Sequence, residues 1–181
     1  PGTGTTGDGY GWVRDLGMEV VEPVPHLVGL RSPEPFVEEL AGVDIPEVEA
    51  RMVDADGRIL ERRRRPVVFT HDGISGPGAM DLSRRLTRPL VERDTPVERF
   101  IELDLFPDHG HDSLRERIVE GSREPGARGV ASLLPEGLPK SVFAVACRKT
   151  GLAEKGLMVD RLSAKDRDRL IETLKRFRVR V

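Results

Sequence analysis

Length, composition and charge set broad limits on this chain. It has 181 residues, of which 38% are hydrophobic and 33% charged, and its formal net charge is -2 at pH 7. Such a composition is typical of a globular protein with one sizeable core or two small subdomains, and the charge gives no overall attraction to nucleic acid or anionic membranes. No apolar run approaches the roughly 20 residues that cross a bilayer. A single cysteine, Cys147, excludes an internal disulfide and a cysteine-based metal site, so we expect a cytoplasmic protein with no membrane partner.

The opening residues, 1–18, are predicted to be a linker followed by a short helix. Asp8 is expected to cap a helix over residues 9–16, because a capping carboxylate accepts hydrogen bonds from the free amides of the first turn. Gly17 then supplies the left-handed residue that ends the helix. The chain begins at Pro1, within a Gly/Thr-rich segment of the kind that connects two elements, so we expect another part of a longer protein to precede it.

Residues 19–107 are predicted to form a mostly antiparallel, β-barrel-like subdomain. Val48, Ala50 and Met52 alternate with polar neighbours, as a strand with one buried face requires. The Asp-Ala-Asp-Gly turn that follows predicts a hairpin. Several short strands bounded by Pro and Gly favour an antiparallel barrel. The expected elements, in chain order, are strands at 18–21 and 26–30, hairpin strands at 48–52 and 58–69, a helix at 77–86 and a strand at 99–106.

Residues 108–160 are predicted to form a small all-helical subdomain, and residues 161–181 an exit helix and strand. Ser163 and Asp166 make a start like a capping box for the exit helix. The fold class is therefore α+β, with a β-barrel-like subdomain beside a helical one. Gly and Pro divide the helical subdomain into short helices, expected at 112–121, 127–134 and 141–151.

Arginines gather in two places, at Arg62–Arg65 on the return strand of the hairpin and at Arg176, Arg178 and Arg180 near the end of the chain. Charged side chains on a sheet edge discourage edge-to-edge pairing, which is one interpretation of the first cluster. A patch that contacts phosphate or RNA is the other. The sequence leaves both open.

Two segments, residues 1–10 and 69–77, place glycine beside hydroxyl residues at the start of a helix. Helix N-termini have unpaired amides, glycine allows close approach of the backbone, and Ser or Thr adds donors, so such segments can bind anions. Ordinary capped turns have the same composition, and that interpretation also stays open. Neither segment matches the dinucleotide fingerprint or the P-loop.

His71, in the second segment, is the most informative titratable residue. Its imidazole can exchange a proton near neutral pH or hydrogen-bond a flavin or substrate carbonyl, although its own loop could also satisfy it. His109 and His111 are expected in an exposed loop, without a metal-ligand arrangement. Cys147 lies in an apolar helix and is expected to be buried rather than nucleophilic.

Both segments also resemble a known family. Residues 3–10, Thr-Gly-Thr-Thr-Gly-Asp-Gly-Tyr, with Pro-His-Leu-Val-Gly-Leu at 25–30, resemble one signature of the BaiN/YhiN-type flavoproteins, which are described as FAD-dependent or aminoacetone-oxidase-like oxidoreductases. Residues 69–77, Phe-Thr-His-Asp-Gly-Ile-Ser-Gly-Pro, resemble the second signature. The order, the spacing and the following Asp-Leu-Phe-Pro at 104–107 also match, so the resemblance covers nearly the whole chain.

In that family an insert with a barrel-like and a helical part separates the two halves of a Rossmann-like FAD domain. The resemblance therefore implies an internal insert-domain fragment, with FAD in the parent protein and the split FAD domain of the same parent chain as its partner. His71 and Ser75 are implied as catalytic candidates that contact substrate or flavin, and no residue is assigned to a metal. The implied cofactor-binding residues are Thr3, Thr5, Thr6, Gly7, Asp8, Gly73 and Gly76.

The leading hypothesis is a substrate-side insert domain that covers the flavin and lines the substrate cavity of an FAD-dependent oxidoreductase, inactive as an isolated fragment. The alternative is a module that binds RNA or another polyanion through the arginine clusters, and a purely structural spacer is a third interpretation. The substrate and the electron donor, NAD(P)H among the candidates, are not predicted by the sequence.

Overall fold

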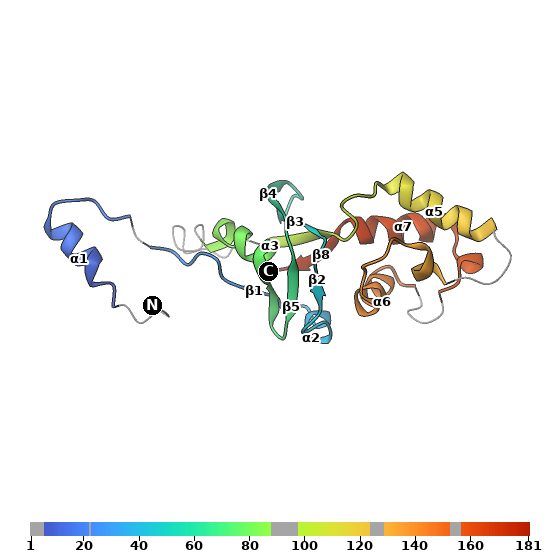
Figure 1. Ribbon diagram of the computed structural model, residues 1–181, viewed down its shortest axis with the longest axis horizontal. Coiled ribbons are helices and arrows are strands. Elements are labelled where there is room, and N and C mark those ends of the chain that lie inside the picture. The colour runs from blue at the N-terminus through green and yellow to red at the C-terminus, as the bar shows by residue number, and fades with distance from the viewer. Residues whose placement is uncertain (1–5, 22, 88–97, 124–128, 153–156) are drawn as a thin grey trace.

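The computed structural model describes residues 6–21, 23–87, 98–123, 129–152 and 157–181. Along its long axis an N-terminal helix comes first, a β region with two sheets occupies the middle, and a group of helices lies at the far end (Figure 1). This is the α+β class expected from the sequence, with a barrel-like part beside a helical part. None of the described helices is long and apolar enough to cross a membrane.

Sheet A has four short strands in the order β1-β6-β5-β2, all paired antiparallel. Its central strands β5 and β6 form a tight hairpin, and the helix α3 (Gly76–Leu82) begins directly after β6. The strand bounds are Leu30–Arg31 for β1, Asp44–Ile45 for β2, Val67–Thr70 for β5 and Gly73–Ser75 for β6.

Sheet B is longer and has the order β4-β3-β7-β8, again all antiparallel. The hairpin β3–β4 confirms the one predicted from the alternating pattern, and a register shift between Met52 and Val53 interrupts its pairing. The expected return strand at 58–69 was wrong in one respect, because it divides near Pro66 into β4 and β5, which belong to different sheets. Proline has no N–H to donate to a ladder, so the chain leaves sheet B there. The bounds are Glu49–Asp54 for β3, Ile59–Arg64 for β4, Arg99–Asp104 for β7 and Phe177–Arg180 for β8.

The two sheets pack against each other through one hydrophobic core. The ring of Phe177 from sheet B meets Phe69 of sheet A edge-on at a centroid distance of 6.4 Å, and Phe36 of helix α2 (Phe36–Glu39) at 5.6 Å. All three belong to the apolar cluster or pack against it, and Phe69 and Phe177 have no exposed surface. Edge-to-face contacts of this kind add to the stabilisation from burial.

The helical part is inserted between β7 and β8. Its α7 packs against α5 and α6, and Ser163 caps α7 by accepting a hydrogen bond from Asp166 N, as predicted. The expected helix at 127–134 was wrong in type, since its described portion is a single 3-10 turn (η1, Val130–Leu133). The helices are α5 (His111–Arg123), α6 (Lys140–Lys149), the 3-10 turn η2 (Val159–Arg161) and α7 (Ala164–Lys175). Cys147 in α6 is buried, as expected.

The last segment, predicted as an exit helix and strand, therefore belongs to both parts. Helix α7 completes the helical part, and β8 is an edge strand of sheet B, paired antiparallel with β7. The chain thus returns to the β region at β8, which pairs with residues of β7 that lie more than seventy positions earlier in the sequence.

The N-terminal helix α1 (Asp8–Asp15) lies apart from the β region (Figure 1). Its cap is Gly7, with a φ of 83° and no side-chain cap bond, so the expectation that Asp8 caps the helix was wrong. Gly17 has a φ of 75° and ends the helix as predicted. The strand expected at 18–21 is not formed, and the strand expected at 26–30 reduces to β1. Helix α1 buries none of its residues, since nothing in the described chain packs on it.

Candidate functional site

The β5–β6 hairpin holds the two residues predicted to be catalytic. His71 and Asp72 form its two-residue turn, and Ser75 lies in β6 opposite Val68. The His71 side chain is exposed at the tip, and within the described residues it makes no hydrogen bond or ion pair. Its imidazole is therefore free to contact a ligand or another part of the protein.

The turn is fixed by its neighbours. The carbonyl of Asp72 accepts a hydrogen bond from Ser32 N at 2.9 Å, and the Thr70 hydroxyl donates to the Asp72 carboxylate at 3.3 Å. Arg31 Nε lies 3.2 Å from the same carboxylate, but both side chains are largely exposed, so this ion pair adds little stability. The backbone bonds hold the hairpin tip in a defined position.

Two glycines of this segment are required by close contacts with the neighbouring backbone. A Cβ at Gly73 would lie 1.8 Å from the carbonyl oxygen of Leu30, because β1 pairs with β6 at this position. Gly76 has a φ of 83°, and a Cβ there would lie 3.0 Å from the Pro66 carbonyl oxygen. Packing of the chain alone therefore requires glycine at both positions, and their predicted role at the cofactor stays a prediction.

A shallow hollow lies beside the hairpin on sheet A. Thr70, Ser75 and Arg31 line it together with Asp72, whose carboxylate accepts a hydrogen bond from the Thr70 hydroxyl and pairs with Arg31. Sequence reasoning singled out Ser75 here but missed Arg31 and Thr70, whose neighbourhood depends on the pairing of β1 with β6. The complete lining is Gly29, Leu30, Arg31, Thr70, Asp72, Ile74 and Ser75.

The predicted cofactor-binding residues of the N-terminal segment lie elsewhere. Thr6 donates a hydrogen bond to the Asp8 carboxylate at the start of α1, next to Gly7. Figure 1 shows α1 well separated from the β5–β6 hairpin, so this chain alone does not bring the two candidate segments together. Thr3 and Thr5 lie outside the described residues. The groove along this helix is lined by its own residues, including Tyr10 and Trp12.

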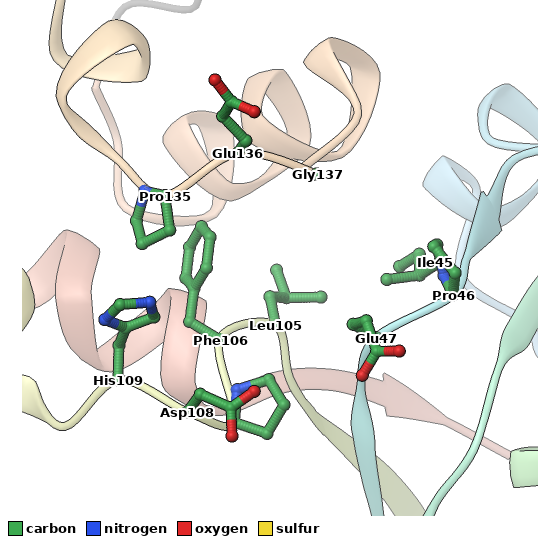
Figure 2. Close-up of a pocket in the computed structure, with 11 residues that line it drawn as sticks. Ile45, Pro46, Glu47, Leu105, Phe106, Asp108, His109, Pro135, Glu136 and Gly137 are labelled. Carbon is green, nitrogen blue, oxygen red and sulfur yellow. The ribbon is translucent and has the colours of Figure 1, made fainter.

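A second hollow, of about 200 Å³, lies where the β region meets the helical part (Figure 2). Leu105 and Phe106 form its floor, and the Phe106 ring points toward the loop that holds Pro135 and Glu136. Asp108 on its rim is bound by both terminal nitrogens of Arg64, and this pairing lowers the pKa of the Asp108 carboxyl. Sequence reasoning missed this hollow, because it forms only when two parts of the fold meet.

His109 and His111 each lie close to a polar side chain of the helical part. His111 begins α5, rather than lying in a loop as expected, and its Nε2 lies 2.9 Å from Glu172 of α7. His109 Nδ1 lies 3.4 Å from the Ser113 hydroxyl. Among the described residues no group of three or more His, Cys, Asp and Glu side chains is arranged to hold a metal ion.

Two antiparallel sheets around a shared core, with a helical part inserted before the last strand, define the class of this protein. The family described as the HI0933-like protein barrel and H2TH domain matches residues 24–181. The chain belongs to this family, which lies within the FAD-dependent oxidoreductase superfamily.

Two curated relatives show the same similarity, and each is named a ribosomal RNA dihydrouridine synthase. The one from Haemophilus influenzae is 27% identical over 144 residues, which cover 78% of this chain and 31% of that protein. The one from Escherichia coli is 27% identical over 182 residues, which cover 99% of this chain and 40% of that protein. The chain therefore spans less than half the length of either relative.

Proposed function

We propose that this chain is the substrate-side insert domain of a FAD-dependent enzyme of the BaiN/YhiN type, and that the enzyme reduces uridine in ribosomal RNA. The observation on which this depends most is the β5–β6 hairpin, whose turn exposes His71 and whose strands contribute Thr70 and Ser75 to the adjoining hollow. Family membership supports the flavin, and the names of the two relatives support the substrate.

Dihydrouridine differs from uridine by the two hydrogens added across its C5–C6 double bond. Bound FAD, once reduced by a nicotinamide, would supply the hydride for one carbon. The other carbon needs a proton, and His71 is the residue of the hairpin that can give one near neutral pH. Ser75, Thr70 and Arg31 would orient the uracil ring or the adjoining phosphate by hydrogen bonds.

Helix α1 would form the border with the split FAD domain. Trp12, Leu16 and Val21 are exposed by 68%, 75% and 76%, although a helix packed in a complete enzyme normally buries its apolar side chains. In this proposal the FAD domain covers them, and Thr3, Thr5, Thr6, Gly7 and Asp8 approach the cofactor from the same side. Gly73 and Gly76 would then serve the cofactor site by keeping the hairpin backbone close to it.

The test uses the full-length reading frame that contains this chain. The purified protein is expected to show a bound flavin absorption band and to form dihydrouridine in ribosomal RNA when supplied with NAD(P)H. A colourless protein that takes up no added FAD would contradict the flavoenzyme assignment. A protein that binds flavin but leaves ribosomal RNA unchanged would support the flavoenzyme assignment and contradict the proposed substrate.

The role of His71 needs its own comparison. His71→Ala is expected to keep the flavin content and to lower dihydrouridine formation by about 100-fold or more, the usual effect of removing a general acid. His26→Ala, at another exposed histidine of the barrel, is the matched control and should match the wild type. Equal turnover of both variants would eliminate His71 as the proton donor.

A further inference from the structure

Members of the two arginine clusters lie on the same face of sheet B, on its two edge strands β4 and β8. The register aligns Arg62 of β4 with Arg51 of β3, Arg51 with Glu102 of β7, and Glu102 with Arg178 of β8. Arg64 and Arg180 follow on the same face, since residues two apart on a strand point the same way. Residues 116 positions apart in the sequence thus form one continuous row across the sheet.

This face points away from the core. The alternate residues of the same strands, such as Met52, Ile101 and Val179, are completely buried, so the arginine row occupies the opposite side. Helix α3 packs on β3 and β4 from the core side, where its Ala79 and Leu82 join the hydrophobic cluster. The arginine side chains stay substantially exposed, 46% for Arg64, 40% for Arg178 and 56% for Arg180, so nothing in the described chain covers them fully.

On this face the carboxylates are buried and the guanidinium groups that bind them lie nearer the solvent. The carboxylate of Glu102 is 3% exposed and accepts hydrogen bonds from both Arg176 and Arg178, at 3.0 to 3.2 Å. Asp104 is 4% exposed and is bound by Arg51 at 2.9 Å and by Lys175 at 2.8 Å. The negative charges are therefore at the base of the layer, and the guanidinium groups lie above them.

A guanidinium held by a carboxylate still has donors to offer. Each guanidinium has five N–H groups, and one carboxylate uses two of them at most, so the others remain for a phosphate. Arg62 is exposed and makes no ion pair within the described residues. The rim is different, since exposed carboxylates such as Asp108 and Glu98 pair with Arg64 and Arg180 there. Arg51 is only 19% exposed and is held by two carboxylates, Glu49 at 2.6 Å and Asp104 at 2.9 Å. Arg62 and Arg178, on the two edge strands, are therefore the arginines of this face with donors left for a phosphate.

At one edge of the face an arginine packs on an aromatic ring. The guanidinium of Arg178 lies 4.4 Å above the ring of Phe100, which pairs with Val53 across the sheet. This cation–π contact holds the Arg178 guanidinium over the Phe100 ring. Proteins use guanidinium planes to stack unpaired bases of RNA, while neighbouring arginines bind the phosphates.

We infer that the outer face of sheet B binds the sugar-phosphate backbone of a single-stranded RNA segment, through Arg62 and Arg178 on its two edge strands. In an enzyme whose substrate is RNA, as proposed above, this segment would adjoin the target uridine. The face would then provide binding energy at a distance from the reacting base, and the β5–β6 hairpin would act on the base itself.

The experiment measures binding of the intact protein to a fluorescently labelled, single-stranded oligoribonucleotide at several salt concentrations. The double variant Arg62→Gln/Arg178→Gln is expected to bind at least about 10-fold more weakly. Its plot of log affinity against log salt should be shallower by roughly 1 to 2, since each phosphate contact adds a little under one to the slope. Arg161→Gln, an exposed arginine of the helical part, is the matched control and should bind as the wild type does.

Flavin absorbance and thermal unfolding of the same samples separate the possible failures. A double variant that keeps its flavin and its wild-type affinity and slope would overturn the inference, even if the protein forms dihydrouridine. A double variant that loses its flavin would also overturn it, because the face would then pack on another protein domain. If the wild type lacks flavin but binds RNA through this face, the inference stands and the proposed enzyme function fails.

Discussion

Lys175, the last residue of helix α7, forms an ion pair with the carboxylate of Asp104, the last residue of strand β7, at an N–O distance of 2.8 Å. The two side chains are only 9% and 4% exposed. The same ammonium donates to the carbonyl oxygens of Phe106, at 2.8 Å, and His109. One buried lysine therefore joins the end of the helical part to the segment that leaves the β region, through one ion pair and two hydrogen bonds.

The first prediction concerns this lysine. Lys175→Met should lower the free energy of unfolding by about 3 to 5 kcal/mol, because it leaves a buried carboxylate with one partner fewer and removes the hydrogen bonds to two carbonyl oxygens. Denaturant unfolding followed by circular dichroism measures the change. Lys165→Met, at an exposed lysine of the same helix, should change the stability by less than about 0.5 kcal/mol. A Lys175 variant as stable as this control would show that the buried ammonium is not required.

Gly73 allows a test between packing and ligand binding. Gly73→Ala should destabilise the fold by about 3 kcal/mol or more, because the new methyl group would overlap the Leu30 carbonyl, a backbone atom that cannot move alone. Gly110→Ala is the matched control, since nothing lies within 4 Å of a Cβ there. Thermal unfolding of both variants decides the matter. A Gly73 variant with wild-type stability and a lost flavin band would assign the glycine to the cofactor instead.

The cap of helix α7 should have a measurable effect of its own. Ser163→Ala removes the acceptor for Asp166 N and should cost about 1 kcal/mol of stability. Ser122→Ala on α5 is the comparison, since that hydroxyl only donates back to the Val119 carbonyl of its own helix. Urea unfolding midpoints for the two variants give the difference. Equal midpoints would mean that the cap adds nothing to stability.

The Arg64–Asp108 pair predicts a dependence of stability on acid. The hydrogen bonds from Arg64 lower the pKa of Asp108 from its usual value of 3.8. A carboxyl whose pKa is lower in the folded state stabilises the protein above pH 3.8, and this stabilisation is lost as the pH falls through the lowered value. Asp108→Asn should therefore flatten the plot of unfolding free energy against pH below about pH 4. Asp44→Asn, at an exposed strand residue, should leave the plot unchanged, and a wild-type slope in the Asp108 variant would contradict the prediction.

A substitution among the exposed apolar residues at the end of α1 should have different effects in the isolated chain and in the intact enzyme. Leu16→Asp should leave the unfolding of the 181-residue chain unchanged, because Leu16 is 75% exposed there. In the full-length protein the same change should lower the flavin content, since a charge would be buried at the proposed border with the FAD domain. Glu19→Gln is the control for both measurements. Normal flavin content in the Leu16 variant would mean that α1 does not form that border.

Much of the candidate site could be predicted because its signals are local. The residues 69–77 suffice to predict a turn and a helix that follows it, and the structure has both. The depth to which Gly73 is enclosed could not be predicted, because it depends on Leu30, more than forty positions earlier. The hollow that contains Ser75, Thr70 and Arg31 depends on the same long-range pairing.

The sequence by itself determined the features that a few neighbouring residues decide. The cap at Ser163, the end of α1 at Gly17 and the β3–β4 hairpin follow from hydrogen bonds and φ angles available within one turn or one pair of strands. Only the tertiary structure decided that Arg62 and Arg178 share a face, that the strand after Pro66 joins a different sheet, and that Lys175 is buried at Asp104. Strand register and the closure of the two sheets depend on contacts between distant residues, and the burial that stabilises them exists only once the whole core has formed.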